Sequence, residues 1–450
     1  MNNTQAVYFA SIEISNSRCF GKNEVLNLSD ENGNWKKWTV ILGDNATGKT
    51  TLLQAISVLE QIEDEEKEPF NEEPWFVSKI AKLKGYNSLF TTNPTYSKHI
   101  KIGTIKAHLL LPNLKDNYSI ENENDKVLDS IYINFNSTGL NALTIQNKKY
   151  HKNLKVYSYG ASRVMSTSTL SEKLSENSET IFNEDAKLIN AEEWLLQLDY
   201  VASKDSEVKQ YAIQKRELIL KTLIDLLPGI DDIRFTVPTK VNLKSTLEFY
   251  SSYGYWLTIH QLSFGYKTMI AWMIDLAARM FERYPESNNP LSEPAIVLVD
   301  EIDLHLHPKW QRKIFEHLSE NFPRTQFIVT AHSPLIVQAA PKDVNLVVLR
   351  KEGDHVVIDQ DIENVHRWRI DQILTSDLFG IESARDPETS EWLEERKVLL
   401  QKETLSPKEK ERLQTLNEKA DNLPTADNAD DIEAMEIIRK AAQYLKTQHT

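Results

Sequence analysis

The sequence predicts an α/β fold with a mixed sheet and flanking helices, and two observations carry this prediction. A compact apolar strand over residues 38–42 leads directly into a glycine-rich turn, and a helix with an apolar face follows over residues 51–62. Strands that alternate with helices favour a parallel sheet with helices on its faces. A second block begins near residue 255 and shows the same alternation of helices and buried strands, over residues 269–280, 295–299, 308–318 and 327–330.

The composition excludes several classes of protein. The 450-residue chain carries 52 Lys and Arg against 66 Asp and Glu, a formal net charge of −14, and 40% of its residues are hydrophobic. This apolar content is enough for a core and excludes a fully disordered chain. The acidic balance argues against a protein that coats nucleic acid over its whole surface, although a local basic face stays open. A single cysteine, Cys19, excludes a disulfide framework and a cysteine-rich zinc module, and indicates a reducing compartment.

No targeting or membrane segment stands out in the sequence. The first residues contain no basic stretch before an apolar run, as a signal peptide would. No apolar run approaches the roughly 20 residues that a membrane span needs. We therefore expect a cytoplasmic protein without a membrane partner.

The remaining elements follow in chain order. Short β-rich segments over residues 7–14 and 24–28 precede the strand at 38–42. Residues 63–150 begin with an acidic stretch and continue with alternating segments typical of strands, whereas residues 191–227 are charged and helical. We interpret both regions as insertions between two halves of one sheet. Toward the end of the chain, two short strands predict a hairpin with a glycine in its turn, over residues 344–349 and 356–358.

The glycine-rich turn matches the phosphate-binding pattern G-x-x-x-x-G-K-[ST]. Glycines let backbone N–H groups converge on phosphate oxygens, and the following helix directs its positive end toward them. Lys49 would reach the β- and γ-phosphates of ATP, and the Thr50 hydroxyl would coordinate Mg²⁺. A chance glycine-rich turn is the alternative, but the flanking strand and helix favour a nucleotide site. The residues of this candidate site are Gly43, Asp44, Asn45, Ala46, Thr47, Gly48, Lys49, Thr50 and Thr51.

An apolar strand over residues 295–299 ends in two carboxylates, Asp300 and Glu301. At the carboxyl end of such a strand, Asp300 can hold Mg²⁺ through water, and Glu301 is placed to polarise an attacking water molecule. A buried strand that ends in solvated acids is a common alternative. A second motif of the right kind, in the right order after the first, favours the catalytic interpretation.

Two weaker motifs complete the set. Ser263 and Gly265 precede the helix at 269–280, so that the start of this helix could form a second anion site. His332 follows the strand at 327–330, at the sheet edge where ligands of α/β proteins bind, and could contact a γ-phosphate. Alone, a Ser-Gly turn before a helix or a histidine after a strand is more often structural. The two stronger motifs make these residues candidates for nucleotide binding.

Together these motifs resemble those of ATPases of the ABC superfamily, in the branch that includes the SMC, RecF and OLD-like proteins. The resemblance does not extend to the transporter subunits. It implies an ABC-type ATPase head whose Asp300 and Glu301 are the Walker B aspartate and the catalytic glutamate. By the same resemblance, Walker A is residues 43–51, the signature motif 262–266, the D-loop 302–307 and the switch histidine His332.

The resemblance also implies a further phosphate contact and an oligomer. The segment Ile14–Phe20 resembles the N-F-R-S-F segment of this branch, which places Arg18 near phosphate. In this family ATP lies between two heads, so the working unit is at least a homodimer. Lys49 and Glu301 would come from one subunit, and the signature residues from its partner. The implied division is a head of three parts over 1–62, 151–254 (with a helical arm) and 255–385, a β-rich insertion over 63–150 and a helical tail over 386–450.

The tail suggests a biological role. Residues 378–381 (LFGI) and 385–388 (RDPE), followed by charged helices, resemble the PtuA family of ATPase subunits from Septu-type and retron-associated anti-phage systems. This resemblance implies a separate HNH nuclease as partner, gated by nucleotide state. The tail, with Trp392, Leu399 and an apolar stripe over 432–445, is the candidate docking surface. Packing against the ATPase head or against a dimer partner is an equal alternative. Asp359 and Asp361 lack the upstream pattern of a nuclease, so we expect no nuclease site in this chain.

The leading hypothesis is an ATP-binding and hydrolysing regulatory subunit of an anti-phage defence complex. One alternative is a DNA-repair ATPase of the RecF or SMC type, and another is the sensor ATPase of a defence system with a different effector. Lysines at 148, 149, 152 and 155 would offer DNA a basic face in either case, although such a run is more often only solvated. DNA therefore stays open as a partner through the complex.

Overall fold

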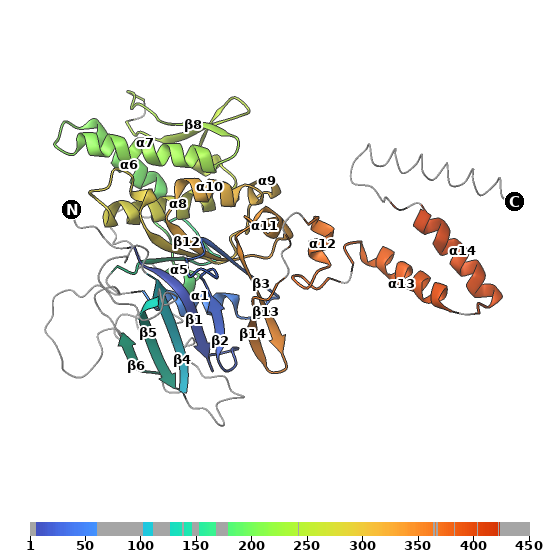
Figure 1. The fold of residues 1–450 in the computed structure, drawn as a ribbon. Coiled ribbons are helices and arrows are strands. Elements are labelled where there is room, and N and C mark those ends of the chain that lie inside the picture. The colour runs from blue at the N-terminus through green and yellow to red at the C-terminus, as the bar shows by residue number, and fades with distance from the viewer. Residues whose placement is uncertain are drawn as a thin grey trace. The chain divides into compact units, whose positions relative to one another are not determined.

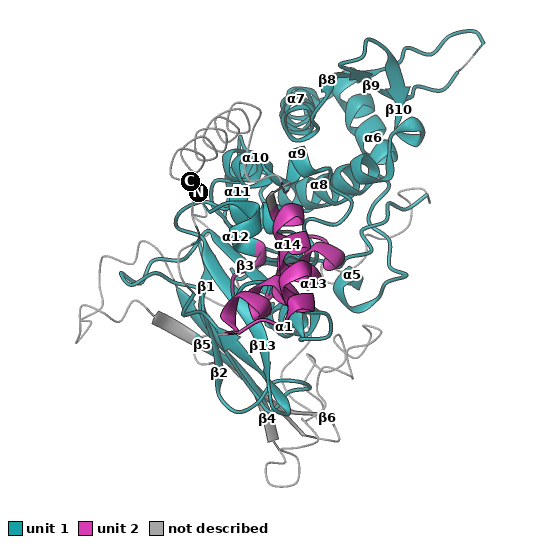
Figure 2. Ribbon diagram, turned by 90° about the vertical axis from the view of Figure 1, so that its right-hand side faces the viewer, with its two compact units in different colours: residues 1–373, 377–379 teal, residues 374–376, 380–450 magenta. Residues whose placement is uncertain are grey.

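A computed structural model describes most of the chain. It covers residues 6–60, 102–110, 127–136, 139–145, 153–167, 179–241, 243–362, 365, 368–381, 383–402, 404–421 and 423. The chain forms two compact units, which Figure 2 distinguishes by colour. The first contains residues 1–373 and 377–379, and the second contains residues 374–376 and 380–450.

A six-stranded mixed sheet is the centre of the first unit. Its strand order is β14-β13-β3-β12-β11-β7, with β14 antiparallel to β13 and all other neighbours parallel. Strands from both halves of the chain therefore share one sheet, as the sequence predicts. The strands are β3 (Trp38–Gly43), β7 (Val156–Tyr159), β11 (Ala295–Val299), β12 (Thr325–Thr330), β13 (Asn345–Glu352) and β14 (His355–Asp359).

Side chains of the central strands alternate between two hydrophobic cores. In β11, Val297 and Val299 belong to the core on one face of the sheet, whereas Ile296 and Leu298 belong to the core on the other. This alternation follows from the two-residue period of a strand. Burial on both faces explains why β11 reads as a continuous apolar run. The α/β fold class with a mixed sheet and flanking helices is confirmed.

Helices cover one face of the sheet, and a second sheet covers the other face together with α1 (Lys49–Ser57) and with α5 (Glu179–Phe182) (Figure 1). The first face carries α6 (Ala191–Ser203), α7 (Lys209–Leu226), α8 (Phe264–Arg283), α9 (Pro308–Gln311), α10 (Ile314–Asn321) and α11 (Pro334–Ala339). The second face carries α1, α5 and strands from an antiparallel sheet of order β2-β1-β4-β5-β6. Its strands are β1 (Tyr8–Ser15), β2 (Glu24–Asn27), β4 (Ile102–Leu110), β5 (Val127–Asn136) and β6 (Gly139–Ile145).

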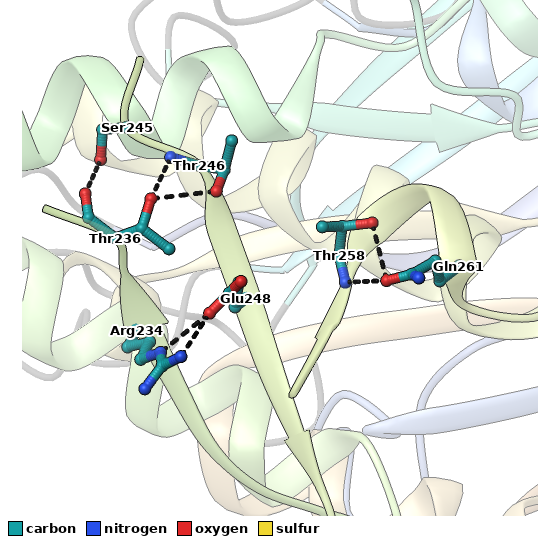
Figure 3. Close-up of polar contacts among 7 residues, drawn as sticks. All are labelled: Arg234, Thr236, Ser245, Thr246, Glu248, Thr258 and Gln261. Carbon is teal, nitrogen blue, oxygen red and sulfur yellow. Dashed lines mark hydrogen bonds and ion pairs between the residues drawn. The ribbon is translucent and has the colours of Figure 1, made fainter. Parts of the chain in front are cut away.

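A small sheet of order β10-β9-β8 lies beside helices α6 and α7 (Figure 2). Its strands are β8 (Ile230–Phe235), β9 (Leu247–Ser251) and β10 (Trp256–Thr258). Cross-strand contacts hold β8 to β9 (Figure 3). Arg234 donates to Glu248 Oε2 from Nε and Nη2 at 2.9 and 2.7 Å, and the hydroxyls of Thr236 and Thr246 lie 3.0 Å apart. The sequence analysis does not predict this sheet, because its strands are short and follow a helical segment.

The second unit contains a helical hairpin. Helices α13 (Pro387–Gln401) and α14 (Pro407–Asp421) enclose a small core of Trp392, Leu399 and Leu416. Two of these residues, Trp392 and Leu399, were candidates for partner docking, and the hairpin covers both of them. The stripe over 432–445 and the lysines at 148, 149 and 152 lie outside the described residues.

Three predicted helices differ from the observed ones. The helix expected over 269–280 is α8, which begins at Phe264 and therefore includes Gly265. The helix expected over 51–62 is α1, which begins at Lys49 and ends at Ser57. The helix expected over 308–318 is two helices, α9 and α10, separated by a turn at residues 312–313. Trp310, Ile314 and Leu318 face the core on both sides of that turn, so the apolar spacing does not reveal it. None of the helices within the described ranges is both long and apolar enough to cross a membrane.

Candidate functional site

The phosphate-binding pattern lies between β3 and α1, as the sequence predicts. Three of its residues have left-handed backbone conformations: Gly43 with φ 145°, Ala46 with φ 64° and Gly48 with φ 89°. A side chain on Gly43 would bring its Cβ within 2.8 Å of both the Leu349 carbonyl oxygen and Thr47 Oγ1. A side chain at Gly48 would collide with the sulfur atom of Cys19. The two glycines of the pattern are therefore required by backbone conformation and by space.

Lys49 folds back over this loop. Its Nζ donates hydrogen bonds to the carbonyl oxygens of Gly43 at 2.8 Å and Asp44 at 2.7 Å. Burial lowers the pKa of Lys49, while Asp300 and Glu301 favour its charged form and act against that shift. The ammonium group is thus a buried cation held by two neutral acceptors. An anionic group in the loop would be a stronger partner for it.

Asp300 joins three segments of the chain. Its carboxylate accepts hydrogen bonds from Thr50 Oγ1 at 2.7 Å and from Thr330 Oγ1 at 2.6 Å. Thr330 Oγ1 in turn accepts the backbone N–H of Glu301 at 2.7 Å. The carboxyl ends of β11 and β12 and the first turn of α1 therefore meet at one buried carboxylate.

The residues after Asp300 turn sharply. Glu301 has φ 49° and lies half-buried beside the loop. Asp303 accepts the backbone N–H of His332 at 3.1 Å, which ties this turn to the end of β12. His332 itself is exposed and lines a cavity of about 160 Å³ with Gly43, Asp44 and Asn45 of the loop and with Leu378 and Phe379.

Arg18 lies against the first turns of α1. Its Nη1 donates to Thr51 Oγ1 at 3.0 Å and to Gln54 Oε1 at 3.2 Å. The sequence analysis expects this residue near phosphate. In this structure its hydrogen bonds go to the helix that starts at the phosphate-binding loop.

Ser263 and Gly265 lie at the start of α8. The Ser263 side chain is exposed and makes no capping hydrogen bond to this helix. Gly265 lies against the carbonyl oxygen of His305, leaving no space for a side chain. The Phe264 ring is 54% exposed and contacts the His305 ring edge to face, with centroids 4.7 Å apart. The signature segment thus packs against the expected D-loop of its own chain.

These segments surround a cleft of about 470 Å³. Thr50, Asp300 and Glu301 line it, together with Phe264 from the start of α8. The opposite wall is formed by residues 160–164, which follow β7, and by the segment around α5 (Glu179–Phe182). Among the residues that line this cleft, neither Ser263 nor Gly265 is present.

Arg163 is a residue of this site whose role the motifs do not predict. From the sequence, residues 159–163 are expected only to end a strand that could border the site. In the structure Arg163 is buried and donates to the carbonyl oxygens of Gly160, Asp300 and Glu301. Because its partners are backbone atoms, no sequence motif records these contacts.

The donor atoms suit a magnesium ion shared with a nucleotide. A threonine hydroxyl and a carboxylate oxygen 2.7 Å apart are hard ligands, and Mg²⁺ in proteins typically takes one or two carboxylates together with substrate phosphates. In the part of the chain that the structure describes, no group of three or more His, Cys, Asp or Glu side chains is arranged to hold a metal.

A protein-family model with the description "AAA domain, putative AbiEii toxin, Type IV TA system" matches residues 38–338, which include every segment around the cleft. The chain belongs to this family. Its other similarities are to relatives with more specific names. The Septu protein PtuA of Bacillus mycoides (strain KBAB4) is 26% identical over 415 residues, which cover 92% of this chain and 50% of that protein. The resemblance to the PtuA family is thereby confirmed.

Retron-associated ATPases match shorter regions. The Retron Vc95 probable ATPase of Vibrio cholerae serotype O1 biovar El Tor is 35% identical over 133 residues, or 30% of this chain and 25% of that protein. The chain spans about half, or less, of the length of these curated relatives. Among solved structures, an SMC head bound to the C-winged helix domain of ScpA aligns with a TM-score of 0.48 and 15% identity, over 78% of this chain and 97% of that one.

Proposed function

We propose that the chain binds ATP with Mg²⁺ between the phosphate-binding loop and the end of β11, and that it hydrolyses the nucleotide. One observation carries this proposal: the hydroxyl of Thr50 and the carboxylate of Asp300 lie 2.7 Å apart although the residues are 250 positions apart in the chain. A P-loop threonine and an aspartate at the end of a neighbouring strand are the pair that holds Mg²⁺ in P-loop ATPases. Membership of an AAA family supports the same activity.

Several groups of this chain bind the nucleotide. Backbone N–H groups from Gly43 to Thr51, including those at the N-terminus of α1, donate hydrogen bonds to the phosphate oxygens. Lys49 exchanges its two carbonyl partners for oxygens of the β- and γ-phosphates, and Arg18 supports the start of α1. Thr50 and Asp300 hold the magnesium ion. Bound Mg²⁺ neutralises negative charge on the β- and γ-phosphates.

Glu301 and His332 act at the γ-phosphate side of the loop. Glu301 follows the Mg²⁺ ligand directly, and its carboxylate orients the attacking water and accepts a proton from it. His332 lines the cavity next to Gly43 and Asp44, where its ring can donate a hydrogen bond to the γ-phosphate. Both residues stand at the edge of the sheet where parallel strands end.

The site closes when two copies of the chain meet. Ser263 and Gly265 of one subunit contact the nucleotide held by Lys49 and Glu301 of the other. The exposed Ser263, whose side chain does not cap the 20-residue helix that follows it, supports this arrangement, since the start of such a helix attracts anions. The exposed Phe264 supports it as well, because it offers apolar surface to a partner.

The biological role follows from the relatives. The chain acts as the ATP-binding regulatory subunit of an anti-phage defence complex, and its nucleotide-dependent dimer controls a separate HNH nuclease. Similarity to a Septu PtuA over 92% of the chain supports this role, and so does similarity to retron-associated ATPases. DNA reaches the complex through the nuclease.

ATP turnover by the purified chain tests the biochemical part of this proposal. We expect Mg²⁺-dependent phosphate release that EDTA abolishes. Turnover that is absent with and without Mg²⁺, in a folded chain alone and with its partner, would refute hydrolysis.

Co-purification with the product of the neighbouring gene tests the biological part. We expect a stoichiometric complex with an HNH nuclease. Tight DNA binding by the chain alone, without a nuclease partner, would favour the DNA-repair function instead.

A further inference from the structure

Arg163 is a buried cation without a carboxylate partner among the described residues. Only 2% of its surface is exposed, and its Nε is buried without a hydrogen bond. Burial lowers the pKa of Arg163 to about 10, against the attraction of Asp300, Glu301 and Asp303. The guanidinium therefore stays charged near neutral pH. Burying such a group is costly unless its donors are used, so its position calls for a reason.

All three hydrogen bonds of this guanidinium go to backbone carbonyls. Nη1 donates to Gly160 at 3.1 Å and to Asp300, and Nη2 donates to Glu301 at 2.9 Å. Arg163 thus connects the carboxyl end of β7 with the carboxyl end of β11. The forked geometry of arginine suits this contact, because two N–H groups reach two neighbouring acceptors at once.

The carbonyls of Asp300 and Glu301, which follow β11, face the same cation only because the chain turns there. Successive carbonyl groups of an extended strand point in opposite directions. Glu301 has φ 49°, a left-handed conformation that residues other than glycine rarely adopt and that costs free energy. This conformation turns the carbonyl groups of Asp300 and Glu301 toward Arg163. The hydrogen bonds from the guanidinium stabilise the turn.

We propose that Arg163 is a positioning residue for ATP hydrolysis: it holds the Asp300–Glu301 turn so that both carboxylates face the phosphate-binding loop. This inference rests on the proposed ATPase activity. The Glu301 peptide is then fixed on both sides, because its N–H donates to Thr330 Oγ1 and its carbonyl accepts from Arg163. The proposal gives Arg163 no contact with the nucleotide, because its two Nη atoms donate to backbone carbonyls instead.

The test compares substitutions at two buried arginines. Arg163→Met removes the charge and all donors, whereas Arg163→Lys keeps the charge and at most part of the fork. Arg279→Lys is the matched control, because Arg279 is 8% exposed and pairs with Asp275 at 2.6 Å, away from the turn. The readouts are kcat, KM, the affinity for Mg·ATP and amide hydrogen exchange at Glu301 and Ile302 in the nucleotide-free protein.

We expect Arg163→Met to lower kcat roughly 10- to 100-fold while KM and the affinity for Mg·ATP change by no more than a few-fold. Arg163→Lys should recover part of kcat, and Arg279→Lys should behave as the wild type. Exchange at Glu301 and Ile302 should be faster in the Arg163 variants only.

Any one of three results would overturn the inference. Folded Arg163→Met could keep the wild-type kcat, or its affinity for Mg·ATP could fall by the same factor as kcat. Amide hydrogen exchange at Glu301 and Ile302 could also be unchanged. If Arg163→Met does not fold, Arg163→Lys against Arg279→Lys decides the question. If the wild type itself does not hydrolyse ATP, the proposed function fails. The exchange measurement, which needs no nucleotide, still shows whether Arg163 holds the turn.

Discussion

Thr330 satisfies two buried polar groups with a single hydroxyl. It donates to the Asp300 carboxylate at 2.6 Å and accepts the Glu301 N–H at 2.7 Å. Removing the hydroxyl would leave the carboxylate with one hydrogen bond fewer and the N–H without its partner. An unsatisfied buried group is more costly than the average hydrogen bond is favourable. The strand residue Thr330 therefore belongs to the site, although it is not part of the motifs that predicted it.

We expect Thr330→Val to lower the free energy of unfolding by about 1–3 kcal/mol, because the shape is kept and the hydrogen bonds are lost. Denaturant unfolding measures this difference. Thr325→Val is the matched control in the same strand, since Thr325 Oγ1 is buried and makes no hydrogen bond with the described residues. That variant should be as stable as the wild type or more so. Equal stability losses in the two variants would contradict this account of Thr330.

At the scale of elements, α8 and the segment 302–307 pack so closely at Gly265 that no side chain fits between them. Gly265 is in the first turn of α8 and lies against the backbone carbonyl of His305. A backbone atom moves less readily than the end of a flexible side chain. A larger residue at position 265 would therefore displace the segment that follows Glu301.

We expect Gly265→Ala to lower stability by about 1–3 kcal/mol, the usual range for a group forced into a filled space. It should also slow ATP hydrolysis, because the displaced segment carries Asp303, which is bonded to the backbone of His332. Thermal unfolding and phosphate release measure the two effects. Wild-type stability and turnover together would show that the contact is not tight.

The second unit provides a prediction of its own. A chain that ends at Arg385 loses only residues of that unit and keeps the phosphate-binding loop, Leu378 and Phe379. We expect its affinity for Mg·ATP to equal that of the full chain within about twofold, a difference well under 1 kcal/mol. Binding of the HNH nuclease should be lost. A truncated chain that still captures the nuclease in a pull-down would place the docking surface within residues 1–385.

Helices and strands are predicted correctly from the sequence where the spacing of apolar residues fits a single type of element. The strand over 295–299 is predicted with its observed bounds, because it consists of five consecutive apolar residues and is followed by the charged Asp300. Residues 308–318 keep their apolar spacing across a turn, so they are predicted as one helix, whereas the structure has two, α9 and α10. The amide of Gln311, at the end of α9, donates to the carbonyls of Asp303 and Leu306. Such tertiary contacts leave no periodic signal.

At the scale of the whole molecule, the site depends on parallel strands that end at one edge of the sheet. The strands β3, β12, β11 and β7 are neighbours, and their carboxyl ends carry the phosphate-binding loop, His332, Asp300 and Arg163. The first three could be predicted because each follows an apolar strand in a known motif. Arg163 could not, because its role depends on carbonyls that only the folded chain brings together.

The proposed dimer makes a prediction about Glu301. We expect Glu301→Gln to keep nucleotide affinity and to slow hydrolysis roughly 10²- to 10⁴-fold, the usual contribution of a general base. Because the nucleotide then persists, Mg·ATP should shift the variant from monomer to dimer. Single-turnover kinetics and analytical ultracentrifugation measure the two effects. Wild-type turnover would remove Glu301 from the mechanism, and a monomer at saturating Mg·ATP would contradict the shared site.

Calorimetric titration of ATP into the wild type and into Lys49→Ala, with and without Mg²⁺, tests the central claim most directly. Lys49 is buried, and among the described residues its ammonium group is held by two loop carbonyls, so removing it should cost little stability but should deprive the phosphates of their cation. We predict Mg²⁺-dependent binding to the wild type and an affinity at least about tenfold weaker in Lys49→Ala, a loss of about 1.4 kcal/mol or more. Equal affinities in the two proteins, or no binding to the wild type, would contradict a nucleotide held at this loop.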